Sequence, residues 1–215
     1  MSDFEHNVFI NCPFDDGYMQ LLRPLVFTVL HLGFTPRLAL ERADSGESRI
    51  DKIVELIQQS RYGIHDLSRC TASKKGEYSR LNMPLELGVD YACKLFKSGR
   101  SRTKRILILE SERHRYKAAL SDLSGSDITA HGNNPETLIV GVRNWMVQEA
   151  SAPPTAAQQI YSDFLDFTAY NPKQLLKRGW KQEHIETMNI IELGKHMKDW
   201  IAKRQEQRDI LGDLF

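Results

Sequence analysis

Residues 80–92, Arg-Leu-Asn-Met-Pro-Leu-Glu-Leu-Gly-Val-Asp-Tyr-Ala, form the stretch around which the rest of the chain can be arranged. Asn82 is a common helix-capping residue and Pro84 is tolerated in an opening helical turn, so a helix is predicted to begin here. Apolar residues recur in it at three- and four-residue intervals, which predicts one buried stripe. The stripe consists of Leu85, Val89, Ala92 and Phe96.

Glu86 is predicted to lie off this stripe, in the first turn of the helix. The positive end of the helix dipole would favour the ionised form of its carboxylate. An ionised carboxylate at such a place suits a nucleophile or an anchor for a hydroxyl group. Acidic residues are also common in first turns without a catalytic role, so the position alone does not assign a function.

The composition indicates one globular domain with an appendage. The chain has 215 residues, 41% of them hydrophobic and 27% charged. Its formal net charge is +1, so no overall field argues for nucleic acid or an anionic membrane as a partner. No apolar run approaches membrane-spanning length and the amino terminus has no apolar signal core, which predicts a cytoplasmic protein without a membrane partner.

Metal and disulfide chemistry are not expected. The three cysteines are scattered and form no Cys-x-x-Cys pair, and the seven histidines lack metal-ligand spacing. Cys12 has no identifiable partner base and is predicted to be a small buried residue. Glycine-rich phosphate motifs are absent, so no bound cofactor is predicted.

Short apolar segments and amphipathic segments alternate along the first two thirds of the chain. This alternation predicts an α/β fold, a parallel sheet covered by helices on both faces. Strands are predicted at residues 7–11, 34–40, 61–66, 104–110 and 128–131. Helices are predicted at residues 18–32, 48–60, 115–122 and 137–149, besides the one that carries Glu86.

Pro153-Pro154 marks a boundary between this α/β domain, residues 1–150, and a helical extension, residues 156–215. Two helices are predicted in the extension, at residues 156–170 and 183–204. Its Trp180 and Trp200 could pack between copies of the chain, so a homo-oligomer is expected.

Ligands of an open parallel sheet bind beyond the carboxyl ends of the strands, where neighbouring crossovers diverge. With the strand order 2-1-3-4-5, that crevice lies between the loops at residues 12–17 and 67–81. Six residues are then expected to converge although some seventy positions separate them. They are Asn11, Pro13, Phe14, Asp15, Asp66 and Glu86.

Paired carboxylates at such a crevice suit cleavage of the bond between a sugar and a nitrogen base. The reaction passes through a cationic, oxocarbenium-like sugar, which an ionised Glu86 would stabilise or attack. Asp66 could orient the substrate or move a proton, or it could simply turn the following loop. Arg69 and Arg80 flank that loop and are candidates for binding phosphate, although each could equally be an exposed loop charge.

Three segments together resemble the nucleoside 2-deoxyribosyltransferase family and the related bacterial Toll/interleukin-1 receptor (TIR) domains. They are Val-Phe-Ile-Asn-Cys-Pro-Phe at residues 8–14, Gly-Ile-His-Asp at 63–66 and Asn-Met-Pro-Leu-Glu-Leu-Gly at 82–88. The resemblance implies a flavodoxin-like sheet and an N-glycosidase or glycosyl transferase. It also implies Glu86 as the catalytic glutamate, Asp66 as the strand-end acid and Asn82 beside them at the substrate.

Two departures from the family pattern refine this expectation. Met83 and Pro84 stand where the transferases often have small residues, and the helical extension has no counterpart in the minimal fold. They favour a module that processes a nucleoside or nucleotide, with NAD a candidate substrate, in a setting such as bacterial antiviral defence. The alternative is a non-catalytic module that senses nucleotides or forms oligomers.

Two further side chains bear on the site. His65 is predicted to point to the opposite face of its strand from Asp66 and to be packed rather than catalytic. The basic run at residues 97–105 joins a helix to a strand at the far edge of the sheet, and is predicted to be a solvated loop.

Overall fold

In the computed structural model, residues 3–70, 81–118, 120–123 and 125–212 are described. Five parallel strands form one sheet in the order β2-β1-β3-β4-β5, as predicted. Their bounds are β1 (Asn7–Asn11), β2 (Thr35–Arg37), β3 (Tyr62–Asp66), β4 (Arg105–Glu110) and β5 (Ile128–Ala130). Every residue of β1 and β3 is buried, as expected for inner strands of a parallel sheet that is covered on both faces.

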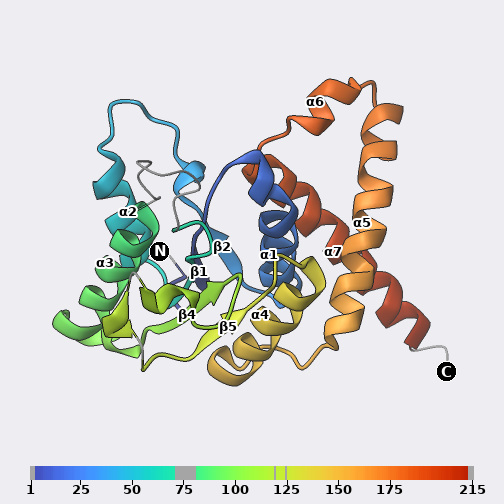
Figure 1. Cartoon of the computed structure of the whole chain (residues 1–215). Coiled ribbons are helices and arrows are strands. Elements are labelled where there is room, and N and C mark those ends of the chain that lie inside the picture. The colour runs from blue at the N-terminus through green and yellow to red at the C-terminus, as the bar shows by residue number, and fades with distance from the viewer. Residues whose placement is uncertain (1–2, 71–80, 119, 124, 213–215) are drawn as a thin grey trace.

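Helices cover both faces of the sheet (Figure 1). On one face lie α1 (Met19–His31) and α4 (Pro135–Ala150), and on the other α2 (Arg49–Gln58) and α3 (Asn82–Phe96). Two helices begin at caps visible in the sequence. The Ser48 side chain accepts a hydrogen bond from the Asp51 amide, and Asn134 accepts one from the Thr137 amide.

The helix predicted at residues 115–122 is wrong. Two short 3₁₀ helices stand there instead, η4 (Arg115–Ala118) and η5 (Ser121–Leu123). His114 precedes them with a φ of 72°. The Arg115 side chain reaches back to the ends of β3 and β4, so this segment follows tertiary contacts rather than helical periodicity.

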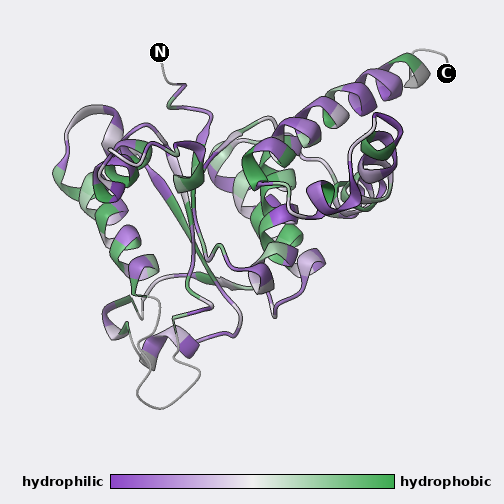
Figure 2. Ribbon diagram, turned by 90° about the horizontal axis from the view of Figure 1, so that it is seen from above, coloured by the Kyte–Doolittle hydropathy of each residue, from purple (hydrophilic) through white to green (hydrophobic). Residues whose placement is uncertain are grey.

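The extension forms α5 (Ala157–Lys177), α6 (Gln182–Glu186) and α7 (Ile190–Gly212), so the helix predicted at residues 183–204 is divided in two. Phe164, Phe167 and Met197 belong to the same hydrophobic cluster as α1 and α4. The Phe27 ring of α1 lies 5.5 Å from that of Phe164 and 5.8 Å from that of Phe167. The extension therefore adds an outer helical layer over α1, from which α7 projects in Figure 2.

Among the described residues, no helix combines the length and the apolar character needed to cross a bilayer. Because all five strands are parallel, their carboxyl ends lie at one edge of the sheet, and the candidate site is at that edge.

Candidate functional site

The face that α3 presents to the sheet differs from the predicted stripe. Its buried residues are Met83, Glu86, Leu87, Asp90 and Cys93. Leu85 is 58% exposed and Phe96 is 85% exposed, so the two ends of the predicted buried stripe point outward. Val89 and Ala92 are half-buried, and Val89 packs against a hydrophobic cluster that includes Phe9 and Ile53. Met83 and Leu87 pack instead with Leu67 and Ile108 on the sheet.

The start of α3 also differs from the prediction. Leu81 occupies the cap position, with no side-chain cap, and Asn82 is the exposed first residue of the helix. Glu86 is therefore the fifth helical residue, beyond the first turn. The dipole effect falls off within that turn, so it does little to favour ionisation here.

Asp90 anchors α3 through a buried polar cluster. One of its carboxylate oxygens lies 3.0 Å from His65 Nε2 and the other 3.1 Å from Lys104 Nζ, and all three side chains are fully buried. Lys104 Nζ also donates to the carbonyl oxygens of Ile57 and Ser60. The prediction that the whole run at residues 97–105 is solvated is therefore wrong at Lys104, whereas the prediction that His65 is packed is confirmed.

Glycine is required at position 63 for this cluster to form. A Cβ atom on Gly63 would lie 2.1 Å from Asp90 Oδ2 and 2.9 Å from His65 Nε2. The Gly63-Ile-His-Asp66 segment thus leaves room for a carboxylate that arrives from α3.

The cluster extends to Asn11 at the end of β1. The Asn11 amide nitrogen donates to the Met83 carbonyl at 2.8 Å and lies 3.0 Å from His65 Nδ1. With Nδ1 as the acceptor, His65 donates from Nε2 to Asp90. Asn11 Oδ1 is buried and has no hydrogen-bond partner among the residues that the structure describes.

Asp66, at the end of β3, is fully buried and both of its oxygens are occupied. Oδ1 accepts from the Ser68 amide at 2.8 Å, and Oδ2 accepts from the Tyr18 hydroxyl and lies 3.0 Å from His131 Nε2. His131 Nδ1 accepts from the Asn133 amide, so Nε2 carries the proton given to Asp66. Burial raises the pKa of Asp66, but the bonds from His131, Ser68 and Tyr18 outweigh it, and the net shift lowers that pKa.

Glu86 has the opposite electrostatic environment. The residue is 4% exposed, and its carboxylate has no hydrogen bond or ion pair within the described part of the chain. Burial raises the pKa of Glu86 to about 7, against a weaker lowering effect of Arg49. The expectation that Glu86 is held ionised is therefore wrong. Near neutral pH this carboxyl group is divided between its acid and its carboxylate, which is typical of groups that exchange protons.

Cys12 lies among the acidic groups of the site. Its side chain is fully buried, as predicted, and burial together with the charges of Asp66, Glu86 and Asp15 raises the pKa of its thiol well above the ordinary value. The three carboxylates come from β3, α3 and the loop after β1, and all act on the pKa of this one thiol.

The loops after β1 and β3 lie side by side, as predicted. A Cβ atom on Gly17 would lie 3.2 Å from Arg69 Nη2 and 3.3 Å from Asp15 Oδ1, and Arg69 Nη2 donates to the Gly17 carbonyl at 3.3 Å. Pro13 is buried and Phe14 packs against the core, so neither presents a fully open surface. Arg80 lies outside the described residues.

The sequence interpretation missed several residues at this edge: Tyr18, Glu110, Ser111, Arg115 and His131. Glu110 Oε1 accepts from the Ser111 amide at 2.7 Å and from Arg115 Nη2 at 2.6 Å, and Arg115 also donates to the Ser68 carbonyl. Glu110 ends β4 and His131 directly follows β5. The position of a polar residue at the end of a predicted strand could therefore have identified both Glu110 and His131 as site candidates.

Metal chemistry gains no support from this arrangement. Within the described ranges, no group of three or more histidine, cysteine, aspartate or glutamate side chains could hold a metal ion. Comparison with protein-family models, curated proteins and solved structures found no match for the chain.

Proposed function

We propose that this protein cleaves the N-glycosidic bond of a nucleoside or nucleotide, with NAD a candidate substrate, at the edge where β1, β3 and α3 meet. The observation that carries the proposal is Glu86, a buried carboxyl group with a pKa of about 7 and no hydrogen bond or ion pair to a described residue. The resemblance of residues 8–14, 63–66 and 82–88 to nucleoside 2-deoxyribosyltransferases and bacterial TIR domains supports the same reaction.

In the proposed reaction the bond between the sugar C1′ and the base nitrogen breaks, and its electron pair leaves with the base. For NAD this pair neutralises the pyridinium nitrogen, so the leaving nicotinamide needs no proton. The ionised form of Glu86 stabilises the sugar cation or bonds to C1′. Water then adds its oxygen to C1′, which breaks the bond to Glu86 wherever that bond has formed, and releases a proton, which the freed carboxylate accepts.

Asp66 serves in this proposal as a positioning residue. Its two oxygens are taken by Ser68, Tyr18 and His131, so it orders the loops at this edge of the sheet rather than carrying a proton itself. Asn11, whose buried Oδ1 has no hydrogen-bond partner in the described part of the chain, is suited to accept a hydrogen bond from a sugar hydroxyl. Pro13, Phe14, Asp15, Arg69 and Asn82 remain candidates for substrate contacts.

The test is to incubate the purified full chain with NAD and with nucleosides and to monitor base release by chromatography. We expect Glu86→Gln to lower kcat by at least about 100-fold, because an amide cannot become the anion that stabilises the sugar cation. Thermal melting establishes that the variant is folded. Base release by Glu86→Gln at the parent rate would contradict the assignment.

Glu136→Gln is the matched control. Glu136 is exposed in the first turn of α4 and follows β5 at the same edge of the sheet, but it has no part in the proposed site. Its substitution should leave base release unchanged.

The second candidate function is non-catalytic: the protein senses a nucleotide without turnover, or assembles into an oligomer. The burial of Glu86 favours it, because a buried carboxylate can hold a ligand hydroxyl without reacting. Calorimetric binding of NAD with no base release would establish this function in place of the first.

A further inference from the structure

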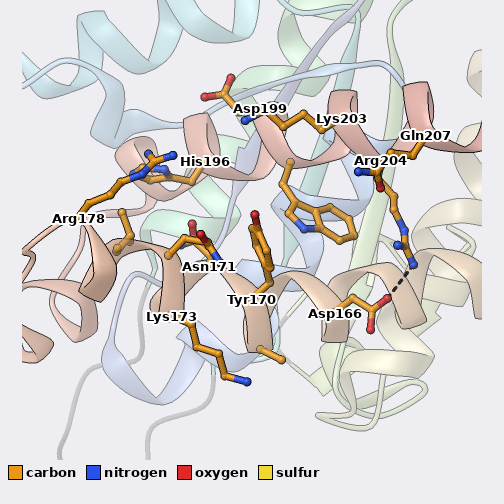
Figure 3. A pocket seen from close by; sticks show the side chains of 14 residues that line it. Asp166, Tyr170, Asn171, Lys173, Arg178, His196, Asp199, Lys203, Arg204 and Gln207 are labelled. Atoms are coloured by element: carbon orange, nitrogen blue, oxygen red, sulfur yellow. Dashed lines mark hydrogen bonds and ion pairs between the residues drawn. The ribbon is translucent and has the colours of Figure 1, made fainter.

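A groove of about 460 Å³ lies between α5 and α7, away from the sheet edge (Figure 3). This volume is within the range of about 300–1,000 Å³ typical of small-molecule sites. The groove shares no residue with the candidate site described above. Its lining combines aromatic rings with several basic side chains.

The groove is lined by more lysine and arginine side chains than carboxylates that could pair with them. Arg204 of the groove is bound to Asp166 at 3.0 Å, as the dashed line in Figure 3 shows. Lys173, Arg178 and Lys203 also line the groove, and none of them forms an ion pair with a described residue. Asp199 is the remaining carboxylate of the lining, so the groove carries a net positive charge suited to an anion.

The aromatic part of the groove is held rigidly. Trp200 packs on its inner side against Phe27 and Phe167, with ring centroids 6.0 Å away in each case. Tyr170 lies beside it in the lining and is 51% exposed. The Arg204 guanidinium lies over the indole, 5.7 Å from its centroid. The exposed phenol of Tyr170 beside this fixed indole offers aromatic contact to a planar ring at little cost in side-chain entropy.

Arg178 is placed to hold an anion at one end of this surface. In Figure 3 its guanidinium group lies beside the ring of His196, at the opposite end of the groove from the Arg204–Asp166 pair. The His196 ring makes an edge contact with Trp180 at 6.3 Å, which fixes its orientation. A guanidinium without a carboxylate partner is a strong and often bidentate binder of phosphate.

We propose that the groove between α5 and α7 binds a nucleoside phosphate, with the base stacked on Tyr170 beside Trp200 and the phosphates held by Arg178. Stacking of a base on an aromatic side chain contributes about 1–3 kcal/mol and tolerates any base. The groove therefore recognises the combination of a planar ring and a phosphate rather than one particular base.

Calorimetric titration with ADP, adenosine and inorganic pyrophosphate, without divalent cations, tests the proposal. ADP should bind at least tenfold more tightly than either adenosine or pyrophosphate, because only ADP engages both parts of the groove. Arg178→Ala and Tyr170→Ala should each weaken ADP binding at least tenfold. Both side chains are partly or largely exposed, so these variants are expected to fold.

Two controls locate the site. Lys198→Ala removes an exposed charge of α7 that does not line the groove, and should leave ADP binding unchanged. Arg69→Ala alters the sheet edge, where the proposed function also places a nucleotide, and should leave unchanged the ADP binding that Arg178→Ala removes. Absence of ADP binding, ADP binding that survives both groove substitutions, or binding lost only in Arg69→Ala would overturn the proposal.

Discussion

The pKa values of two buried carboxyl groups of the candidate site are shifted in opposite directions, and their hydrogen bonds account for the difference. Burial raises the pKa of Glu86 to about 7 because no described donor stabilises its anion. Burial acts on the pKa of Asp66 in the same direction, but the donors His131, Ser68 and Tyr18 reverse the shift. Glu86 is thus the group able to exchange a proton near neutral pH, whereas Asp66 stays ionised and ordered.

The Glu86 shift predicts a pH-dependent stability. A carboxyl group with a raised pKa in the folded state favours folding when protonated, and this advantage is lost as the pH rises from its ordinary pKa of 4.5 towards about 7. Glu86→Gln removes the ionisation. The free energy of unfolding of the variant minus that of the parent, measured by urea denaturation, should therefore be larger at pH 8 than at pH 5. An identical difference at the two pH values would show that Glu86 is not shifted.

The orientation of α3 is set by its polar buried residues as much as by its apolar ones. Turning Leu85 and Phe96 inward would take Asp90 away from His65 and Lys104, and would leave the buried Lys104 ammonium without its carboxylate. An unpaired buried charge is more costly than exposed apolar surface. The helix therefore buries Met83, Leu87 and Cys93 and exposes the two ends of the more regular apolar stripe, Leu85 and Phe96.

Alanine substitutions on the two faces of α3 test this orientation. Leu87 is 2% exposed, so Leu87→Ala should lower the free energy of unfolding by about 2–5 kcal/mol through the cavity that it leaves. Phe96 is 85% exposed, and Phe96→Ala should change that free energy by less than about 0.5 kcal/mol. Chemical denaturation measures both, and a larger loss for Phe96→Ala would mean that the helix is turned the other way.

At the scale of the whole molecule, Asp163 joins the extension to the α/β layers. This residue of α5 is 1% exposed, lies 2.9 Å from His31 Nε2 of α1 and accepts two hydrogen bonds from Arg208 of α7. Burial raises the pKa of Asp163, but Arg208 and His31 more than compensate, so that its pKa is lowered. One carboxylate therefore connects three helices that are distant in the sequence.

Asp163→Asn should lower the free energy of unfolding by about 1–3 kcal/mol at pH 7, since it removes the carboxylate that pairs with the buried His31 and the partly exposed Arg208. Because the pKa of Asp163 is lowered by folding, its contribution is present at neutral pH and is lost as the pH falls below the ordinary aspartate value of 3.8. The difference between parent and variant should shrink accordingly. Amide exchange should also speed up in α7.

Asp166→Asn is the matched control for Asp163→Asn. The Asp166 side chain is 52% exposed and pairs with Arg204, so its loss should cost no more than about 1 kcal/mol. Equal costs for the two substitutions would contradict the role given to Asp163.

The sequence by itself determined the alternation of strands and helices, and with it the sheet order and the edge where Asn11, Asp66 and Glu86 gather. Strand runs and helix caps are local signals, and right-handed crossovers leave few ways to connect them. Only the tertiary structure decided the face of α3, the burial of Lys104 and the partners of Asp66. Tyr18 and His131 reach Asp66 from 48 and 65 residues away, and such contacts depend on packing that no local pattern records.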